Sequence, residues 1–397
     1  MKRLGLLLAI ACKSKRMDEP MPQPPPVPDA AVVPADAAKP WPELEGYTRV
    51  GPQRVIALPS RPDTPKFTLG GPVIIGGLAV VASSQFGFVG LDWKRGTIAW
   101  TKTAGTRVAP PLVIDREGTG SIALFGDCVR PPEVGAGEVL VGCLRVVTAT
   151  GTDRTYVAIR GKPKLMDAFL AERGQQQTWL VDDRTVRWLR GEQAITIDLI
   201  TGAAKPALPA PPPVVVEYKS KRWDIAHVDG RVVAYKGGTS QVSWQTEHPY
   251  TRILGPVWLT EMGPMIRIAN ASHRDPHVDL IDIDATGSLH AQVAKPTPGI
   301  DVLAGAASSV GDAALAIRLD SSLRRDLIVG YAANALLMWV YPLPEHQRVD
   351  RVGIAISDEA DAVVVFHDGD TVTVLPELSA PPTSPGATRV PSKNPTP

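Results

Sequence analysis

The segment His273–Asp279 gathers two histidines and two aspartates within seven residues. Imidazole and carboxylate groups are the ligands that Zn²⁺ and related divalent ions take up in proteins. Pro276 would break a helix that placed both histidines on one face, and Arg274 adds a repelling positive charge. We therefore interpret the segment as a solvated loop between strands, and we expect no metal and no other cofactor.

Motifs for catalysis are otherwise missing from the sequence. It contains no G-x-S-x-G, no G-x-x-x-x-G-K-[ST], no H-E-x-x-H and no complete G-x-G-x-x-G. The 42 Lys and Arg residues balance 41 Asp and Glu residues at a net charge of +1, which argues against binding of nucleic acid. The sequence predicts a protein that is not an enzyme.

The first twelve residues resemble an export signal. Met1-Lys2-Arg3 is positively charged, the apolar run Leu4–Ala11 follows, and Cys12 comes next. A cysteine in this position resembles a bacterial lipobox, so residues 1–11 are expected to be a lipoprotein signal peptide and Cys12 the lipidated residue. Lys13 is not the aspartate that commonly retains lipoproteins in the inner membrane, which favours the outer membrane. The alternative is an ordinary apolar N-terminus on a cytosolic protein.

Proline marks both ends of the chain. Residues 12–42 include nine prolines between positions 20 and 42. Because proline lacks a backbone donor and fixes φ, this stretch predicts an extended tether that holds a folded body away from a membrane. It could instead be a ligand for a proline-recognising domain. Residues 379–397 predict a disordered tail, and residues 43–378 the folded body.

Cys128 and Cys143 are the two cysteines that remain. A turn-rich stretch that includes Pro131-Pro132, Gly135 and Gly137 separates them. In an exported protein this pair is expected to form a disulfide, and the alternative is two buried free thiols.

The body reads as short strands separated by Gly, Pro, Asn and Asp. Leu78–Ser83 and Gly87–Leu91 form one predicted pair, and Ala362–Phe366 and Thr371–Leu375 another. Only Lys164–Arg173 has a helical pattern. The fold class is therefore predicted to be all-β.

One segment shows a repeat-like spacing. The strand Phe88-Val89-Gly90-Leu91 ends at Asp92, Gly96 follows four residues later, and Trp100 four residues after that. Gly96 would supply a turn position with positive φ, and Trp100 would anchor the outer strand against its neighbour. Weaker echoes lie at Ile197–Gly202 and Ile281–Gly287.

This pattern resembles the repeat of quinoprotein-like (PQQ-repeat) β-propellers, a group that includes the BamB-like lipoproteins of outer-membrane assembly. The resemblance implies a β-propeller of four-stranded antiparallel sheets. Strand clusters near 75–103, 110–160, 176–208, 213–246, 253–294, 301–342 and 350–375 predict seven blades, with eight as the alternative. Tyr47–Leu58 is expected to pair beside Val363–Leu375 and close the ring.

The predicted function is a membrane-anchored, non-enzymatic scaffold in the bacterial cell envelope. The scaffold would bind a protein partner as a monomer, with BamB-like outer-membrane assembly as one version. A glycan-binding surface module would need exposed tryptophans on one face. A quinoprotein-like enzyme would need polar residues gathered at the ring axis, and the sequence shows no adjacent-cysteine pair and no calcium ligand cluster.

Overall fold

A computed structural model describes residues 44–378, except 59–69, 84, 105–107, 116–119, 129–132, 134–135, 172–175, 209–213, 229–230, 238, 247–251, 261–262, 273–276, 285, 293–296, 309, 321–324, 344–351 and 358–360. The predicted signal peptide, Cys12, the proline-rich tether and the tail lie outside the described residues.

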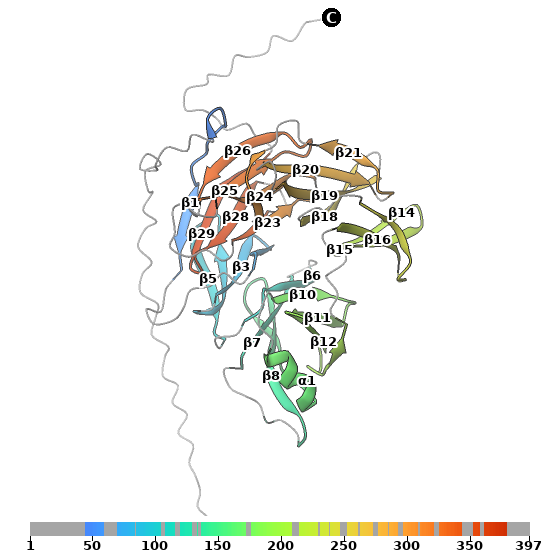
Figure 1. Ribbon diagram of the computed structural model, residues 1–397. Helices are drawn as coiled ribbons and strands as arrows, with labels where there is room; N and C mark the ends of the chain where they lie inside the picture. Colours follow the sequence, from blue (N-terminus) through green and yellow to red (C-terminus); the bar gives the residue numbers. More distant parts are fainter. Residues whose placement is uncertain are drawn as a thin grey trace, which may run out of the picture.

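The described strands form seven antiparallel sheets, which are the blades of a β-propeller (Figure 1). Blade 1 consists of β2 (Val73–Ile75), β3 (Leu78–Ser83), β4 (Gly87–Asp92) and β5 (Thr97–Lys102). Blade 2 consists of β6 (Leu112–Asp115), β7 (Ser121–Gly126), β8 (Val139–Thr148) and β9 (Asp153–Gly161). Blade 3 consists of β10 (Gln176–Leu180), β11 (Thr185–Arg190), β12 (Gln193–Asp198) and β13 (Ala204–Ala207).

The next three blades repeat this order. Blade 4 consists of β14 (Val214–Tyr218), β15 (Lys221–Val228), β16 (Arg231–Lys236) and β17 (Val242–Gln245). Blade 5 consists of β18 (Arg252–Thr260), β19 (Gly263–Ser272), β20 (His277–Asp284), β21 (Leu289–Gln292) and the short β22 (Thr297–Pro298). Blade 6 consists of β23 (Asp301–Ala307), β24 (Ala313–Asp320), β25 (Arg325–Tyr331) and β26 (Leu337–Pro342). The prediction of seven blades is confirmed.

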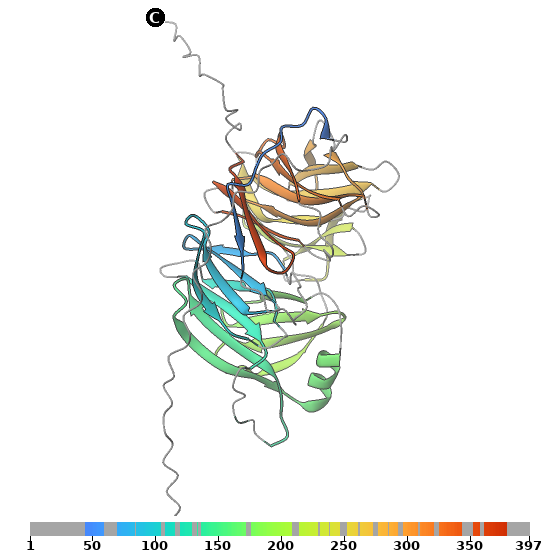
Figure 2. The ribbon, with the colours of Figure 1, turned by 90° about the vertical axis from the view of Figure 1, so that its left-hand side faces the viewer.

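Blade 7 combines both ends of the described chain. Its strands are β27 (Gly353–Ile356), β28 (Ala362–His367), β29 (Thr371–Pro376) and β1 (Arg54–Ala57). β1 pairs antiparallel with β29, with Arg54 opposite Val374, as expected for Tyr47–Leu58 (Figure 2). This pairing removes the free edge that an open blade 7 would expose.

Apolar side chains on both faces of the sheets hold neighbouring blades together. All six residues of β28, from Ala362 to His367, are buried. A strand covered on both faces reads as a continuous apolar run rather than an alternating one. That burial explains why β-branched and aromatic residues dominate these short segments.

The one helix among the described residues is α1 (Pro163–Ala171), close to the predicted Lys164–Arg173. Its buried Met166 and Phe169 pack between blades 2 and 3, where the Phe169 ring meets Trp188 edge-on at 5.0 Å. No helix in the described part of the chain has the length and apolar character needed to cross a bilayer.

Candidate functional site

Asp92 and Gly96 form a tight turn between the third and fourth strands of blade 1. The backbone carbonyl of Asp92 accepts from the Gly96 amide at 2.7 Å, and its Oδ1 accepts from the Arg95 amide at 2.9 Å. Gly96 has a φ of 75°, a conformation that costs glycine little. These two residues of the predicted repeat motif therefore shape a turn.

Asp198 and Gly202 build the same turn in blade 3. The Gly202 amide donates to the Asp198 carbonyl at 2.9 Å. Donation from the Thr201 amide, together with the Arg184 side chain and further local donors, lowers the pKa of Asp198 to about 2. Oδ1 of Asp198 accepts from the amides of Ile200 and Thr201, so the carboxylate stabilises its own turn.

Trp100 connects two blades. It lies in β5 opposite Gly90, and its Nε1 donates to the carbonyl oxygen of Ala149 at 2.9 Å. Ala149 precedes the turn between β8 and β9 of blade 2. Trp100 thus anchors its outer strand, as the repeat spacing suggested, but the hydrogen bond runs to the next blade.

Cys128 and Cys143 are joined by a disulfide with an S–S distance of 2.04 Å. Cys143 lies in β8 opposite Gly126, and Cys128 follows the end of β7. The bond ties the start of the β7–β8 connection to the sheet of blade 2.

The His273–Asp279 segment is described only in part, because 273–276 lie outside the described residues. The interpretation as a solvated loop is wrong for His277–Asp279, because these residues begin β20 and both Val278 and Asp279 are buried. Nε2 of His277 lies 3.3 Å from Oδ2 of Asp279. Among the described residues no group of three or more His, Cys, Asp or Glu side chains could hold a metal ion.

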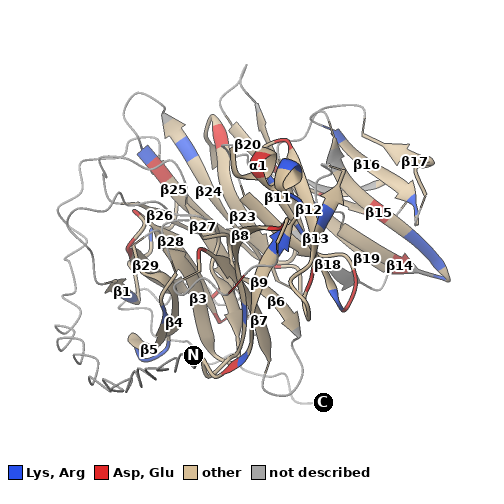
Figure 3. Ribbon diagram, turned by 90° about the horizontal axis from the view of Figure 1, so that it is seen from below, with Lys and Arg blue, Asp and Glu red and all other residues tan. Residues whose placement is uncertain are grey.

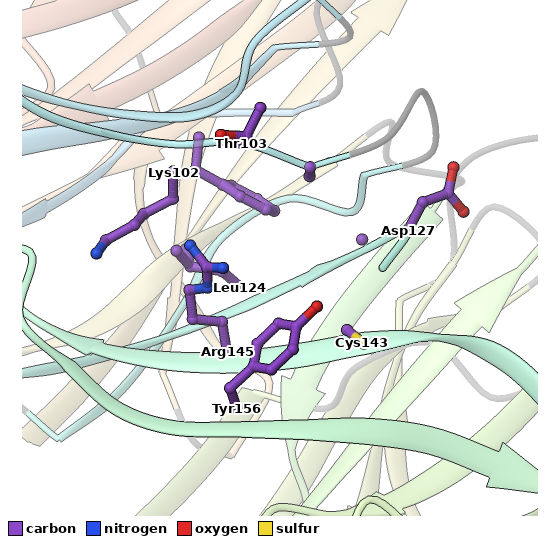
Figure 4. Close-up of a pocket in the computed structure, with 10 residues that line it drawn as sticks. Lys102, Thr103, Leu124, Asp127, Cys143, Arg145 and Tyr156 are labelled. Atoms are coloured by element: carbon purple, nitrogen blue, oxygen red, sulfur yellow. The ribbon is translucent and has the colours of Figure 1, made fainter. Parts of the chain in front are cut away.

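A shallow pocket lies between blades 1 and 2, beside the disulfide (Figure 4). The space over this depression, open solvent included, is about 250 Å³. Its lining comes from the ends of β4, β5 and β7 and from the middle of β8 and β9: Phe88, Lys102, Thr103, Ala104, Leu124, Gly126, Asp127, Cys143, Arg145 and Tyr156. Sites for small organic ligands enclose most of the ligand. This depression is too small and too open to do so, and a partner could contact it only at its rim.

Two basic side chains and the ring of Tyr156 line the pocket. Lys102 Nζ lies 3.2 Å and Arg145 Nε 3.7 Å from the same Oδ1 of Asp153, so two cations share one carboxylate. The Arg145 guanidinium also lies 5.1 Å from the centre of the Tyr156 ring, and Figure 4 shows the two side by side. Asp127 lines the opposite end. The arrangement can bind a polar or acidic side chain and stack an aromatic one.

No sequence motif marks this pocket. Lys102, Arg145 and Tyr156 belong to no motif, because three strands from two blades supply them. One signal was present: Arg145 interrupts the apolar run of β8, and a charge in such a run needs a partner.

Tryptophans do not form an exposed platform in the described part of the chain. Trp93, Trp188, Trp223 and Trp339 are buried, and Trp100, Trp179 and Trp244 are half-buried. Basic and acidic residues are interspersed over the blades viewed from below (Figure 3). Neither observation favours a glycan-binding surface or a nucleic-acid stripe.

No model of a known protein family matches this chain, and no curated protein sequence matches it. Solved structures of β-propellers, in contrast, match this chain in fold. A chain of the mitotic checkpoint complex has a TM-score of 0.50 at 12% identity, covering 86% of this chain and 96% of that chain. The Cps50 (Swd1) propeller domain of Myceliophteria thermophila has a TM-score of 0.48 at 10% identity, with coverages of 80% and 99%. BamB from Moraxella catarrhalis has a TM-score of 0.41 at 11% identity, with coverages of 83% and 99%. At such identities the likeness is one of fold.

Proposed function

We propose that this chain is a membrane-anchored, non-enzymatic propeller that binds a protein partner in the bacterial cell envelope. The anchor rests on the sequence from Met1 to Cys12, and the reach on the proline-rich residues 12–42. BamB-like outer-membrane assembly is one form of this role, with the outer membrane preferred and the propeller acting as a monomer.

The pocket between blades 1 and 2 is the observation that carries partner binding. Tyr156 is 41% exposed, and Arg145 is held against it by Asp153. Tyr and Arg are among the residue types that dominate binding energy at protein interfaces, above all when they are held rigid beforehand. The disulfide at Cys143 and the blade sheets provide that rigidity.

One similar solved structure supports this proposal. The propeller chain with the TM-score of 0.50 belongs to the mitotic checkpoint complex, which is an assembly of proteins. A ring of blades suits such roles because its loops are presented on a scaffold that barely deforms.

The partner is tested by photo-cross-linking in intact cells. Tyr156 is replaced by benzoylphenylalanine, and the matched control carries the same group at Val310, which is 57% exposed on blade 6. We expect one cross-linked envelope protein from position 156 and none from position 310. Equal or absent cross-linking at the two positions would contradict partner binding at the pocket.

The anchor has its own test. Palmitate labelling with and without globomycin should mark the wild-type chain and leave Cys12→Ser unlabelled. A wild-type chain that takes up no palmitate would remove the membrane anchor and leave the partner site to be judged separately.

A further inference from the structure

Blades 3 and 4 share no buried apolar cluster among the described residues. Buried clusters join blades 1 and 2, 2 and 3, 4 and 5, 5 and 6, 6 and 7, and 7 and 1. Blade 3 buries Val186 and Trp188 against blade 2, and blade 4 buries Val216 and Ile225 against blade 5. The other faces of blades 3 and 4, which follow each other around the ring (Figure 1), are called here the blade 3–4 seam.

The seam face of blade 4 is an open apolar row. Val215, Asp224, Tyr235 and Val242 lie opposite one another across β14, β15, β16 and β17. Val215 is 45% and Val242 48% exposed, while Tyr235 is partly exposed. In the other six interblade spaces the facing strands share a buried apolar cluster.

The seam face of blade 3 presents a cationic row. Trp179, Arg187, Thr196 and Lys205 lie opposite one another across β10, β11, β12 and β13. The Arg187 guanidinium lies 5.8 Å from the Trp179 ring, and its buried Nε has no hydrogen-bond partner. Neither Arg187 nor Lys205 has a carboxylate within 4.0 Å in the described part of the chain.

Among the described residues, no carboxylate of blade 4 neutralises the cationic row of blade 3. Asp224, the one acid in the open row of blade 4, pairs with Arg222 of its own blade, with Nε and Oδ1 3.1 Å apart. The Arg187 side chain is half-buried and has no carboxylate beside it in the described part of the chain, so an incoming carboxylate would meet a guanidinium that is not yet neutralised.

We propose that the blade 3–4 seam binds an extended segment of a partner protein in which acidic and apolar residues alternate. Successive side chains of an extended strand point to opposite faces. The acids of such a segment would meet Arg187 and Lys205, while its apolar residues would cover Val215, Tyr235 and Val242. This inference rests on the proposed protein-binding function and names the chemistry of one partner segment.

The test uses the folded chain and a fluorescein-labelled heptapeptide of alternating glutamate and valine, followed by fluorescence anisotropy. The controls are the lysine–valine heptapeptide and a glutamate–valine peptide of the same composition in two blocks. We expect the alternating acidic peptide to bind at least about tenfold more tightly than either control. Its affinity should fall as salt rises, because the ion pairs are partly exposed.

Two variants locate the site. Arg187→Gln and Val242→Ser should each weaken binding of the acidic peptide about tenfold. Lys221→Gln is the matched control: it removes one positive charge from the opposite face of blade 4 and should leave the affinity unchanged. Circular dichroism confirms that each variant is folded.

Equal binding of the three peptides, or equal affinity of the variants and Lys221→Gln, would overturn the inference. So would a concentration-dependent dimer that Val242→Ser dissociates, because it would assign the seam to a second copy of the chain. Cross-linking at position 156 without peptide binding leaves the proposed function standing and removes only the seam. Peptide binding at the seam without a cross-linked envelope partner would leave the seam standing and remove the proposed envelope function.

Discussion

The indole ring of Trp100 covers Gly151 so closely that a Cβ at this glycine would lie 2.5 Å from Cγ of the tryptophan. Trp100 belongs to the outer strand of blade 1, and Gly151 to the turn between the third and fourth strands of blade 2. The same relation holds between Trp244 of blade 4 and Gly287 of blade 5. In both cases a tryptophan of an outer strand packs on a glycine turn of the following blade.

Gly151→Ala should destabilise the protein by about 3 kcal/mol, as a methyl group forced against the indole adds overpacking to the strain of a positive φ. Gly46→Ala is the control, because its φ is also 81° and a Cβ there meets no atom within 4 Å. Urea unfolding measures both variants. Equal losses of stability would show that the Trp100 contact contributes nothing.

Much of the ring could be predicted from the sequence because each blade is made from neighbouring segments. The Asp92–Gly96 turn, the seven strand clusters and the closing strand all follow from local periodicity and turn chemistry. The pocket and the seam could not be predicted in this way. Arg145, Tyr156 and Lys102 meet only after two blades pack, and the half-covered Val215 and Val242 look like ordinary strand residues until the neighbouring blade is placed.

The buried ion pair between Arg267 and Asp282 should be costly to break. The two side chains make two hydrogen bonds, at 2.7 and 2.8 Å, and Arg267 is fully buried. Arg267 also donates to the Gly311 and Ala333 carbonyls of blade 6, so it joins two blades.

Arg267→Met should therefore cost about 4 kcal/mol, because it leaves Asp282 buried without its partner. The double change Arg267→Met with Asp282→Leu should recover part of this loss, since no charge is then left unpaired. Chemical denaturation of the wild type, of Arg267→Met, of Asp282→Leu and of the double variant completes the cycle. A double variant less stable than the single one would refute this account.

Asp284 should make the protein sensitive to acid. Burial raises the pKa of this carboxyl, but hydrogen bonds from Thr286, His290 and the Ser288 amide outweigh burial and lower the pKa from 3.8 to about 2. A carboxyl with a lower pKa in the folded chain stabilises it above the unfolded pKa, and this contribution is lost as pH falls toward 2. Asp284→Asn should thus lower the urea midpoint at pH 6 and lower it less at pH 3. Asp167→Asn, on the exposed side of α1, is the control, and a pH-independent difference for Asp284→Asn would contradict the assignment.

The turn between β14 and β15 should be easy to improve. Lys219 and Ser220 have φ values of 48° and 61°, the conformation of a two-residue hairpin turn that glycine and asparagine prefer. Ser220→Gly should stabilise the protein by about 1 kcal/mol. The Cβ of serine raises the energy of a left-handed conformation that glycine adopts freely. Thermal unfolding provides the measurement, with Ser243→Gly inside β17 as a control that should destabilise. A lower melting temperature for Ser220→Gly would show that the serine side chain matters more than the backbone strain.

The disulfide between Cys128 and Cys143 should contribute about 3 kcal/mol, because it closes a loop of 15 residues in the unfolded chain. Replacing both cysteines by serine should lower the urea midpoint accordingly. Adding dithiothreitol during unfolding should bring the wild-type midpoint close to that of the double variant and leave the double variant unchanged.

Loss of the disulfide should also alter the pocket between blades 1 and 2, because Cys143 lines this pocket beside Arg145. Cross-linking at position 156 should therefore weaken in the double variant at temperatures where its propeller is still folded. Full cross-linking in that variant would show that the blade sheet alone positions Tyr156.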